Sequence, residues 1–240
     1  MRETDTMART KTFSADLREK LLLWCDRHCC LCRKQCDVFI ELHHIVPKSE
    51  GGGDDEDNAI PLCFDCHGRV GHYNAEHPKG AKYRASELKR RRDQVYDEFT
   101  RHLVPALHYR IETRGGLPDV GFSIGHLGDT PPVKVGVTVE PYIDYKKCTE
   151  FEDSVYQGRE FWNLNPKEVV FGHFSIPARA AQTNTPIIIG VNIAIHDCLD
   201  RVHNLLPVTY VHDRKNPGWW LDPFDVASSA RRLKKEFSGR

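Results

Sequence analysis

The sequence predicts an α+β protein in which a small zinc-stabilised module is followed by an antiparallel β-sandwich. Two observations lead to this prediction. Seven of the nine cysteines lie between Cys25 and Cys66, which indicates a metal-bound segment. Beyond residue 108, apolar and polar residues alternate through at least five segments with no strong helical pattern between them. We therefore expect one domain at residues 1–106 and a second at residues 107–240.

In the first domain, two helices are expected to frame the cysteine-rich segment. Ser14 is a helix-capping residue, and it precedes apolar side chains at helical spacing. These side chains are Leu17, Leu21 and Trp24. A second helix is expected from about Ser86, and it ends by Val104 because Pro105 cannot continue it.

The second domain is predicted from strand-like segments separated by turn residues. The segments lie at residues 120–124, 133–139, 170–176, 187–195 and 208–210. A short basic helix at residues 228–237 closes the chain. We expect the pairs Phe161-Trp162 and Trp219-Trp220 to plug the ends of the sandwich, with a ligand platform or a partner surface as the alternative.

Composition narrows the range of functions. Of the 240 residues, 28% are charged and 40% hydrophobic, which favours a folded globular protein over a disordered one. Lysine plus arginine and aspartate plus glutamate are both 34, so attraction to nucleic acid must come from local patches. The longest nearly apolar run, residues 186–195, is far shorter than the ~20 residues of a membrane span. Since the N-terminus also lacks the apolar stretch of a signal peptide, we expect a cytoplasmic protein with no membrane contact.

Two C-x2-C pairs are the clearest chemical signal. Cys29 and Cys32 form one pair, Cys63 and Cys66 the other, and 30 residues separate the pairs. Four thiolates at this spacing are typical of a closed structural zinc site. Three more cysteines lie nearby: Cys25, Cys30 and Cys36. We expect Cys25, on the apolar face of the first helix, to be a core residue, whereas Cys36 is an alternative zinc ligand.

The segment between and after these pairs, ELHHIVPKSEGGGDDEDNAIPLCFDCHGRVGHY at residues 41–73, resembles the HNH endonucleases, also called ββα-metal nucleases. It has a His-containing strand end, a Gly-Gly loop, an Asn and a Cys-x-x-Cys-His on a helix. The resemblance covers roughly residues 25–97. The following residues also look like HNH modules that are fused to sensing domains in bacterial antiphage effectors.

The resemblance implies a role for each motif residue. His44 takes the position of the general base, and Asn58 takes that of the residue that holds the His-bearing loop. His43 and His67 take the positions of the ligands of one catalytic cation. Mg²⁺ is the expected ion. Mn²⁺ and Ni²⁺ are alternatives because His43 stands where many members have Asp, and imidazole favours transition metals.

Other titratable residues near the motif are candidate secondary site residues. His72 is a candidate auxiliary metal ligand. Four basic residues are candidate phosphate contacts: Lys48, Arg69, Lys89 and Arg90. The acidic run at residues 54–57 is expected to be a solvated loop, with a partner contact or an autoinhibitory element as alternatives.

The sequence therefore predicts a metal-dependent nuclease with DNA as its substrate. The sandwich is expected to select or regulate the target through DNA, a protein partner, a nucleotide signal or self-association. Its architecture suggests a restriction or antiphage effector role. The alternatives are a catalytically silent, zinc-stabilised module that binds nucleic acid or protein, and a subunit of a larger complex.

Overall fold

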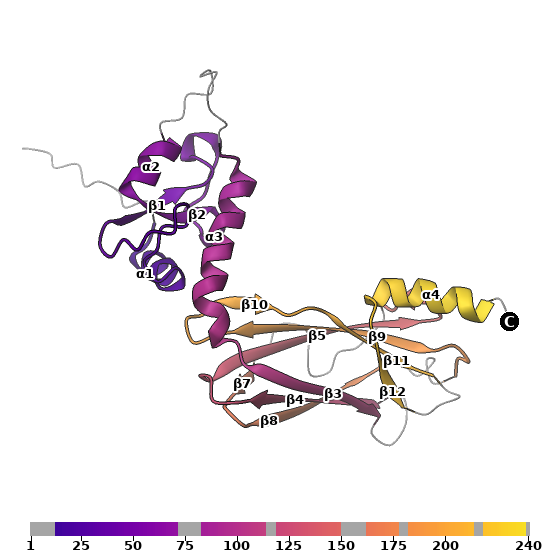
Figure 1. The fold of residues 1–240 in the computed structure, drawn as a ribbon. Coiled ribbons are helices and arrows are strands. Elements are labelled where there is room, and N and C mark those ends of the chain that lie inside the picture. The colour runs from indigo at the N-terminus through magenta and orange to yellow at the C-terminus, as the bar shows by residue number, and fades with distance from the viewer. Residues whose placement is uncertain are drawn as a thin grey trace, which may run out of the picture. The chain divides into compact units, whose positions relative to one another are not determined.

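The structure is a computed structural model that describes residues 13–71, 83–113, 119–149, 162–177, 182–213 and 218–238 (Figure 1). Contacts divide the chain into two compact units, Met1–His102 and Leu103–Arg240. The predicted α+β fold class is confirmed, since a mixed helical and β module precedes a largely antiparallel sheet domain.

Two helices flank a hairpin in the first unit. Helix α1 (Ala15–Trp24) begins after Ser14, whose side chain accepts a hydrogen bond of 3.1 Å from the Leu17 amide. Helix α3 (Ala85–Thr100) packs on α1, where the rings of Trp24 and Tyr96 meet edge to face with centroids 5.4 Å apart. The α-helix ends at Thr100, and a 3-10 turn, η3 (Arg101–Leu103), continues the chain toward Pro105.

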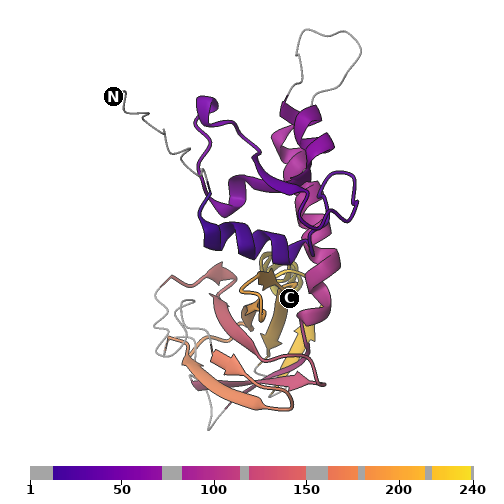
Figure 2. The same cartoon turned by 90° about the vertical axis from the view of Figure 1, so that its left-hand side faces the viewer.

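The hairpin and the helix after it form a ββα unit. Strands β1 (Ile40–His44) and β2 (Ala59–Cys63) pair antiparallel, with Ile40 opposite Cys63 and His44 opposite Ala59. Helix α2 (Phe64–Gly71) follows β2 directly. The loop between the strands contains two 3-10 turns, η1 (Lys48–Glu50) and η2 (Glu56–Asn58). Strand β2 is buried along its length against α1 and α3 (Figure 2).

The second unit is a sandwich of two antiparallel sheets. The smaller sheet has the order β3-β4-β8, and the larger has the order β12-β11-β9-β5-β6, with β10 paired to β9 and β7 paired to β5. The strands of the smaller sheet are β3 (Ala106–Thr113), β4 (Asp119–Leu127) and β8 (Val169–Ser175). Those of the larger are β5 (Val133–Ile143), β6 (Lys146–Lys147), β7 (Trp162–Leu164), β9 (Ile187–His196), β10 (Val202–Asn204), β11 (Val208–His212) and β12 (Trp219–Asp222).

The core of the second unit lies between these sheets. Alternate residues of β5 and β9, among them Val137 and Ile193, meet Phe122 and Phe174 of the smaller sheet. Helix α4 (Val226–Ser238) packs on the outer face of the larger sheet, where Leu233 joins a separate apolar cluster. Within the described ranges, no helix has the length and apolar character to cross a bilayer.

Candidate metal centre and active site

Four cysteine sulfurs converge in the first unit. The Sγ atoms of Cys29, Cys32, Cys63 and Cys66 all lie within 4.8 Å of one another, and those of Cys32 and Cys63 are 3.8 Å apart. A tetrahedral zinc with Zn–S bonds of about 2.3 Å separates its sulfurs by about 3.8 Å. The donor type, number and spacing therefore fit a structural zinc ion.

Local backbone geometry brings the two cysteine pairs together. Cys29 lies in a tight turn closed by a hydrogen bond of 2.9 Å from its amide to the Lys34 carbonyl. Cys63 ends β2 and Cys66 lies in the first turn of α2, so the second pair bridges a strand and a helix. A metal held here connects the turn, the hairpin and α2.

The remaining cysteines of this segment lie outside the four-sulfur cluster. The Cys36 thiol donates to the Lys34 carbonyl at 3.0 Å, and the Cys25 thiol contacts the Leu22 carbonyl at 3.5 Å. Burial raises the pKa of the Cys30 thiol well above its usual value. Cys25 and Cys30 are thus buried side chains of the core beneath α1, as was expected of Cys25.

His43 on β1 and His67 on α2 face each other. Their rings meet edge to face, with centroids 4.7 Å apart, and the Glu41 carboxylate lies 4.0 Å from His67 Nε2. Burial, followed by the nearby His67 and His44, lowers the pKa of His43 to about 4. His43 is therefore a neutral imidazole at pH 7, which is the form that binds a metal.

His44 is held by contacts on two sides. Its ring stacks on Phe13 at a centroid distance of 4.3 Å, and its Nε2 lies 2.7 Å from Asp54 Oδ1. Lys48 lies 2.5 Å from the other oxygen of Asp54, and hydrogen bonds from Lys48 and His44 lower the pKa of this carboxyl. An ionised carboxylate only accepts hydrogen bonds, so Nε2 carries the proton. In the neutral ring the lone pair then belongs to Nδ1.

Asn58 braces the loop that follows His44. Its Oδ1 accepts a hydrogen bond of 2.7 Å from the Val46 amide, while its Nδ2 donates to the Val46 and Gly53 carbonyls at 3.0 and 2.9 Å. The Asn58 carbonyl also accepts from the Ile45 amide at 2.8 Å. One buried side chain thus connects both arms of the loop and fixes the backbone directly after His44.

Gly52 packs against the Val46 carbonyl and the Asn58 side chain, and only a residue without a side chain fits there. A Cβ atom at this position would lie 1.8 Å from the Val46 carbonyl oxygen and 2.6 Å from Asn58 Nδ2. We expect Gly52→Ala to displace the loop and to destabilise the first unit by about 1–3 kcal/mol. Hydrogen exchange of residues 45–58, measured by mass spectrometry, should become faster in this variant.

Gly68 offers the matched control for that substitution. It lies on α2, and a Cβ there would meet nothing within 4 Å. Gly68→Ala should leave exchange in residues 45–58 unchanged, because alanine also favours a helix. Equal exchange rates in Gly52→Ala and the unmodified protein would show that the loop does not depend on close packing at this position.

The acidic run at residues 54–57 lies in an exposed loop, as expected, and each of its acids also has a hydrogen-bond or ion-pair partner. Asp54 binds His44 and Lys48, and Asp55 caps η2 by accepting from the Asn58 amide at 3.0 Å. Glu56 pairs with Lys20 at 2.9 Å, and Asp57 pairs with Lys89. Basic residues of α1, α3 and the loop therefore offset the negative charge of this exposed run.

Arg92 on α3 holds this loop through hydrogen bonds to its backbone. Its buried guanidinium donates to the carbonyls of Glu56, Asp57 and Ala59 at 3.1, 2.8 and 3.2 Å. These carbonyls flank Asn58 on both sides. Arg92 thereby fixes the turn that contains Asn58. The sequence did not indicate this role, because Arg92 is one of four consecutive basic residues.

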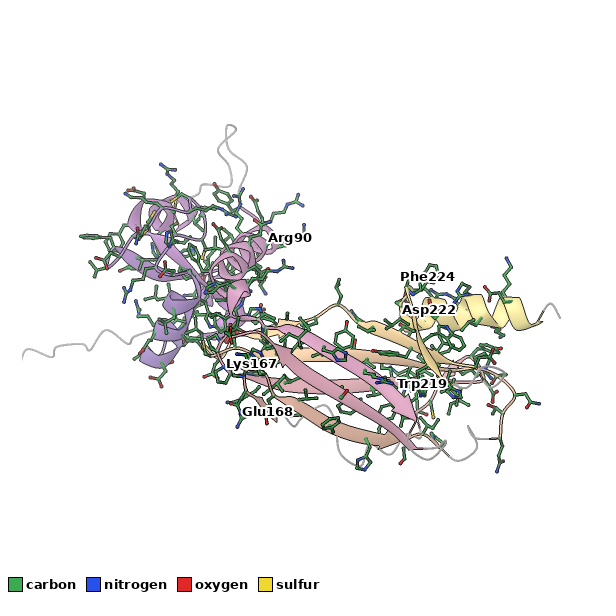
Figure 3. The ribbon with its side chains drawn as sticks, turned by 60° about the horizontal axis from the view of Figure 1, so that its bottom comes forward. Arg90, Lys167, Glu168, Trp219, Asp222 and Phe224 are labelled. Carbon is green, nitrogen blue, oxygen red and sulfur yellow. The ribbon has the colours of Figure 1, made fainter. Side chains whose placement is uncertain are left out.

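The candidate phosphate contacts differ in their surroundings. Lys48 and Lys89 are engaged by Asp54 and Asp57, respectively. Arg69, in the last turn of α2, is exposed. Arg90, on α3, is also exposed (Figure 3). His72, the candidate auxiliary ligand, lies outside the described residues.

Comparison with known proteins agrees with this geometry. Residues 29–72 match the family model described as HNH endonuclease. It is also 44% identical over 36 residues to the type IV methyl-directed restriction enzyme EcoKMcrA of Escherichia coli (strain K12). That match spans 15% of this chain and 13% of the relative.

Three contributors to the site were not foreseen from the sequence. Phe13 stacks on His44, Asp54 orients it, and Glu41 approaches His67. Of these, Glu41 had a usable signal, because residues two apart on a strand share a face and Glu41 precedes His43 by two. Phe13 and Asp54 reach the site through the tertiary fold.

Proposed function

We propose that the protein is a metal-dependent endonuclease that hydrolyses phosphodiester bonds in DNA, with His44 as the general base. The observation that carries this proposal is the arrangement around β1. His44 has its Nε2 engaged by Asp54, while His43 and His67 form a neighbouring pair of imidazoles. Together with the HNH match, this arrangement favours hydrolysis over a purely structural role.

His44 would take the proton from the attacking water at Nδ1. The ionised Asp54 holds the opposite nitrogen and stabilises the positive charge that the ring gains on accepting this proton. Phe13 limits rotation of the ring from one side. Asn58 and Arg92 keep the following loop in place, so that the base stays at a fixed distance from the bond to be cleaved.

His43 and His67 are the residues that would hold the catalytic cation, and Glu41 adds a nearby carboxylate. A divalent cation bound there would neutralise charge on the phosphate and stabilise the leaving oxygen. Mg²⁺ is the expected ion. Mn²⁺ and Ni²⁺ are alternatives, because two imidazoles form a softer donor set than carboxylates do. Arg69 and Arg90 are exposed and available to contact the DNA backbone.

The second unit would direct or regulate this activity in a cytoplasmic restriction or antiphage effector. The net charge of zero supports this view, because a protein without overall positive charge needs a separate means of finding DNA. The matched relative is a methyl-directed restriction enzyme. Modified DNA therefore belongs among the substrates to be tested.

A cleavage assay tests the proposal. Supercoiled plasmid from methylating and non-methylating hosts is incubated with the protein and Mg²⁺, Mn²⁺ or Ni²⁺. We expect nicking that requires an added cation and that falls at least ~100-fold in His67→Ala, because one of two ligands is lost. Zinc content should stay at the wild-type level in that variant, since His67 is not one of the four sulfur donors.

The matched control is His102→Ala, which removes an exposed imidazole from the same unit. It should cleave at the wild-type rate. Nicking that persists without any added cation, or that is equal in His67→Ala and wild type, would contradict the assignment. Intact plasmid in every metal with both DNA sources would favour the non-catalytic alternative.

A further inference from the structure

The sandwich has a hollow along one edge, where its two sheets meet. Its walls come from β3, the edge strand of the smaller sheet, and from β11 and β12 at the edge of the larger sheet. Its volume is about 460 Å³. Sites for small molecules are typically ~300–1,000 Å³, so the hollow is of a suitable size for one.

Strand register shows that the hollow is an uncovered part of the sandwich interior. Leu221 lies opposite Tyr210, and Trp219 lies opposite His212, so these residues project from the same face of the larger sheet. Tyr210 is buried in the core on that face. Leu221 nevertheless remains 61% exposed. An inward-facing position that stays open is a place where a ligand can complete the packing.

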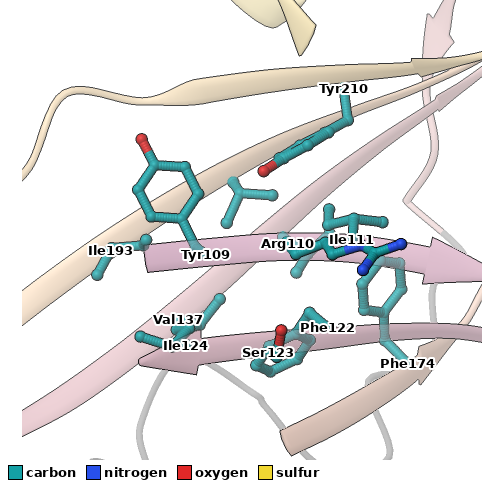
Figure 4. A pocket seen from close by; sticks show the side chains of 12 residues that line it. Tyr109, Arg110, Ile111, Phe122, Ser123, Ile124, Val137, Phe174, Ile193 and Tyr210 are labelled. Atoms are coloured by element: carbon teal, nitrogen blue, oxygen red, sulfur yellow. The ribbon is translucent and has the colours of Figure 1, made fainter. Parts of the chain in front are cut away.

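Aromatic rings from three strands line this hollow: Tyr109 on β3, Tyr210 on β11 and Trp219 on β12. Figure 4, drawn around a smaller cavity that the two tyrosines also line, shows them projecting toward it from opposite sheets. Beyond them, this second cavity between the sheets has a volume of only about 10 Å³. Apolar side chains line it, Phe122 and Phe174 among them. A ligand would therefore stop at the tyrosine rings.

Polar groups in the hollow define what such a ligand must carry. The indole Nε1 of Trp219 is buried and has no hydrogen-bond partner among the described residues. An unsatisfied buried donor is costly, so a bound acceptor would stabilise it. Burial raises the pKa of Tyr210 to about 12, which keeps its hydroxyl protonated. Arg110, an exposed residue of β3, adds a positive charge at the rim.

We propose that this hollow binds a nucleobase that carries a phosphate. A nucleobase offers a flat π-face for the aromatic rings and ring nitrogens or carbonyls that accept from the indole. The phosphate matches Arg110, whose guanidinium is suited to phosphate oxygens. The same chemistry is present in a free nucleotide and in an unstacked base of a DNA strand.

Calorimetric titration of the full chain, without added divalent cation, tests this site independently of cleavage. The ligands are AMP, GMP, CMP and UMP, a single-stranded oligonucleotide and the matching duplex. Ribose 5-phosphate and inorganic phosphate serve as base-free probes. Binding of the mononucleotides identifies a free-nucleotide site. Binding of the oligonucleotides alone identifies a site for a base within a strand.

Two neighbouring tryptophans provide a matched pair of variants. Trp219→Leu removes the ring and donor from the hollow and should weaken binding at least about tenfold. Trp220→Leu removes a ring from the opposite face of the same strand and should bind as wild type does. Leu221→Glu, at a side chain already 61% exposed, places a negative charge in the hollow and should also reduce binding.

Three results would overturn the proposal. They are the absence of binding for every base-containing ligand, equal binding by base-free phosphates, and equal losses in Trp219→Leu and Trp220→Leu. Thermal unfolding of each variant shows whether its sandwich is intact. Should Trp219→Leu fail to fold, Leu221→Glu decides, and unchanged nucleotide affinity in a folded Leu221→Glu protein would place the ligand elsewhere.

Discussion

Replacing His44 with alanine is expected to slow plasmid nicking by about 10²–10⁴-fold, the usual contribution of a positioned general base. The fold should persist, because His44 is only partly buried and Asp54 keeps Lys48 as a partner. Zinc content and thermal midpoint should match those of the unmodified protein. Imidazole added to the reaction should restore part of the lost rate, since the cavity left by the ring can admit it.

The rescue separates a catalytic role from a structural one. A variant that had lost activity through misfolding would not respond to imidazole, whereas one that lacks only the base would. His102→Ala again serves as the control for removal of an imidazole. Equal cleavage by His44→Ala and wild type would show that another group activates the water, and the proposed base would have to be abandoned.

Replacing Cys63 with serine is expected to unfold the first unit. Structural zinc contributes roughly 10–16 kcal/mol in zinc-finger peptides, whereas a whole domain is stable by only about 5–15 kcal/mol. Cys63 is also the residue at which β2 passes into α2, and its backbone pairs with Ile40. Loss of this ligand should therefore release the hairpin, α2 and the loop that contains Asn58.

Metal analysis and limited proteolysis would measure this effect. The variant should contain less than one zinc per chain and be cleaved readily within residues 13–102, while the sandwich, which has its own core, stays resistant. Cys36→Ser should keep its zinc, because that thiol bonds to the Lys34 carbonyl outside the four-sulfur cluster. An unchanged thermal midpoint with zinc still bound in Cys63→Ser would refute the prediction.

Much of the fold followed from local sequence patterns. Large apolar side chains stand at every second position of residues 187–195, because β9 buries one face in the sandwich core. This alternation was enough to predict the strand. Strands β3 and β12 were not anticipated. Both are edge strands with an exposed face, so their apolar pattern is weak, and pairing with β4 and β11 places them in the sheets.

The sequence by itself determined the C-x2-C pairs and the order of histidines and asparagine around them, because these spacings act within single turns, strands and helices. Only the tertiary structure decided which nitrogen of His44 is free, that Asp54 and Phe13 hold its ring, and that Arg92 supports the Asn58 turn. It also revealed the aromatic hollow, whose walls come from three strands. Such contacts join residues distant along the chain, and their geometry is fixed by packing that no local spacing encodes.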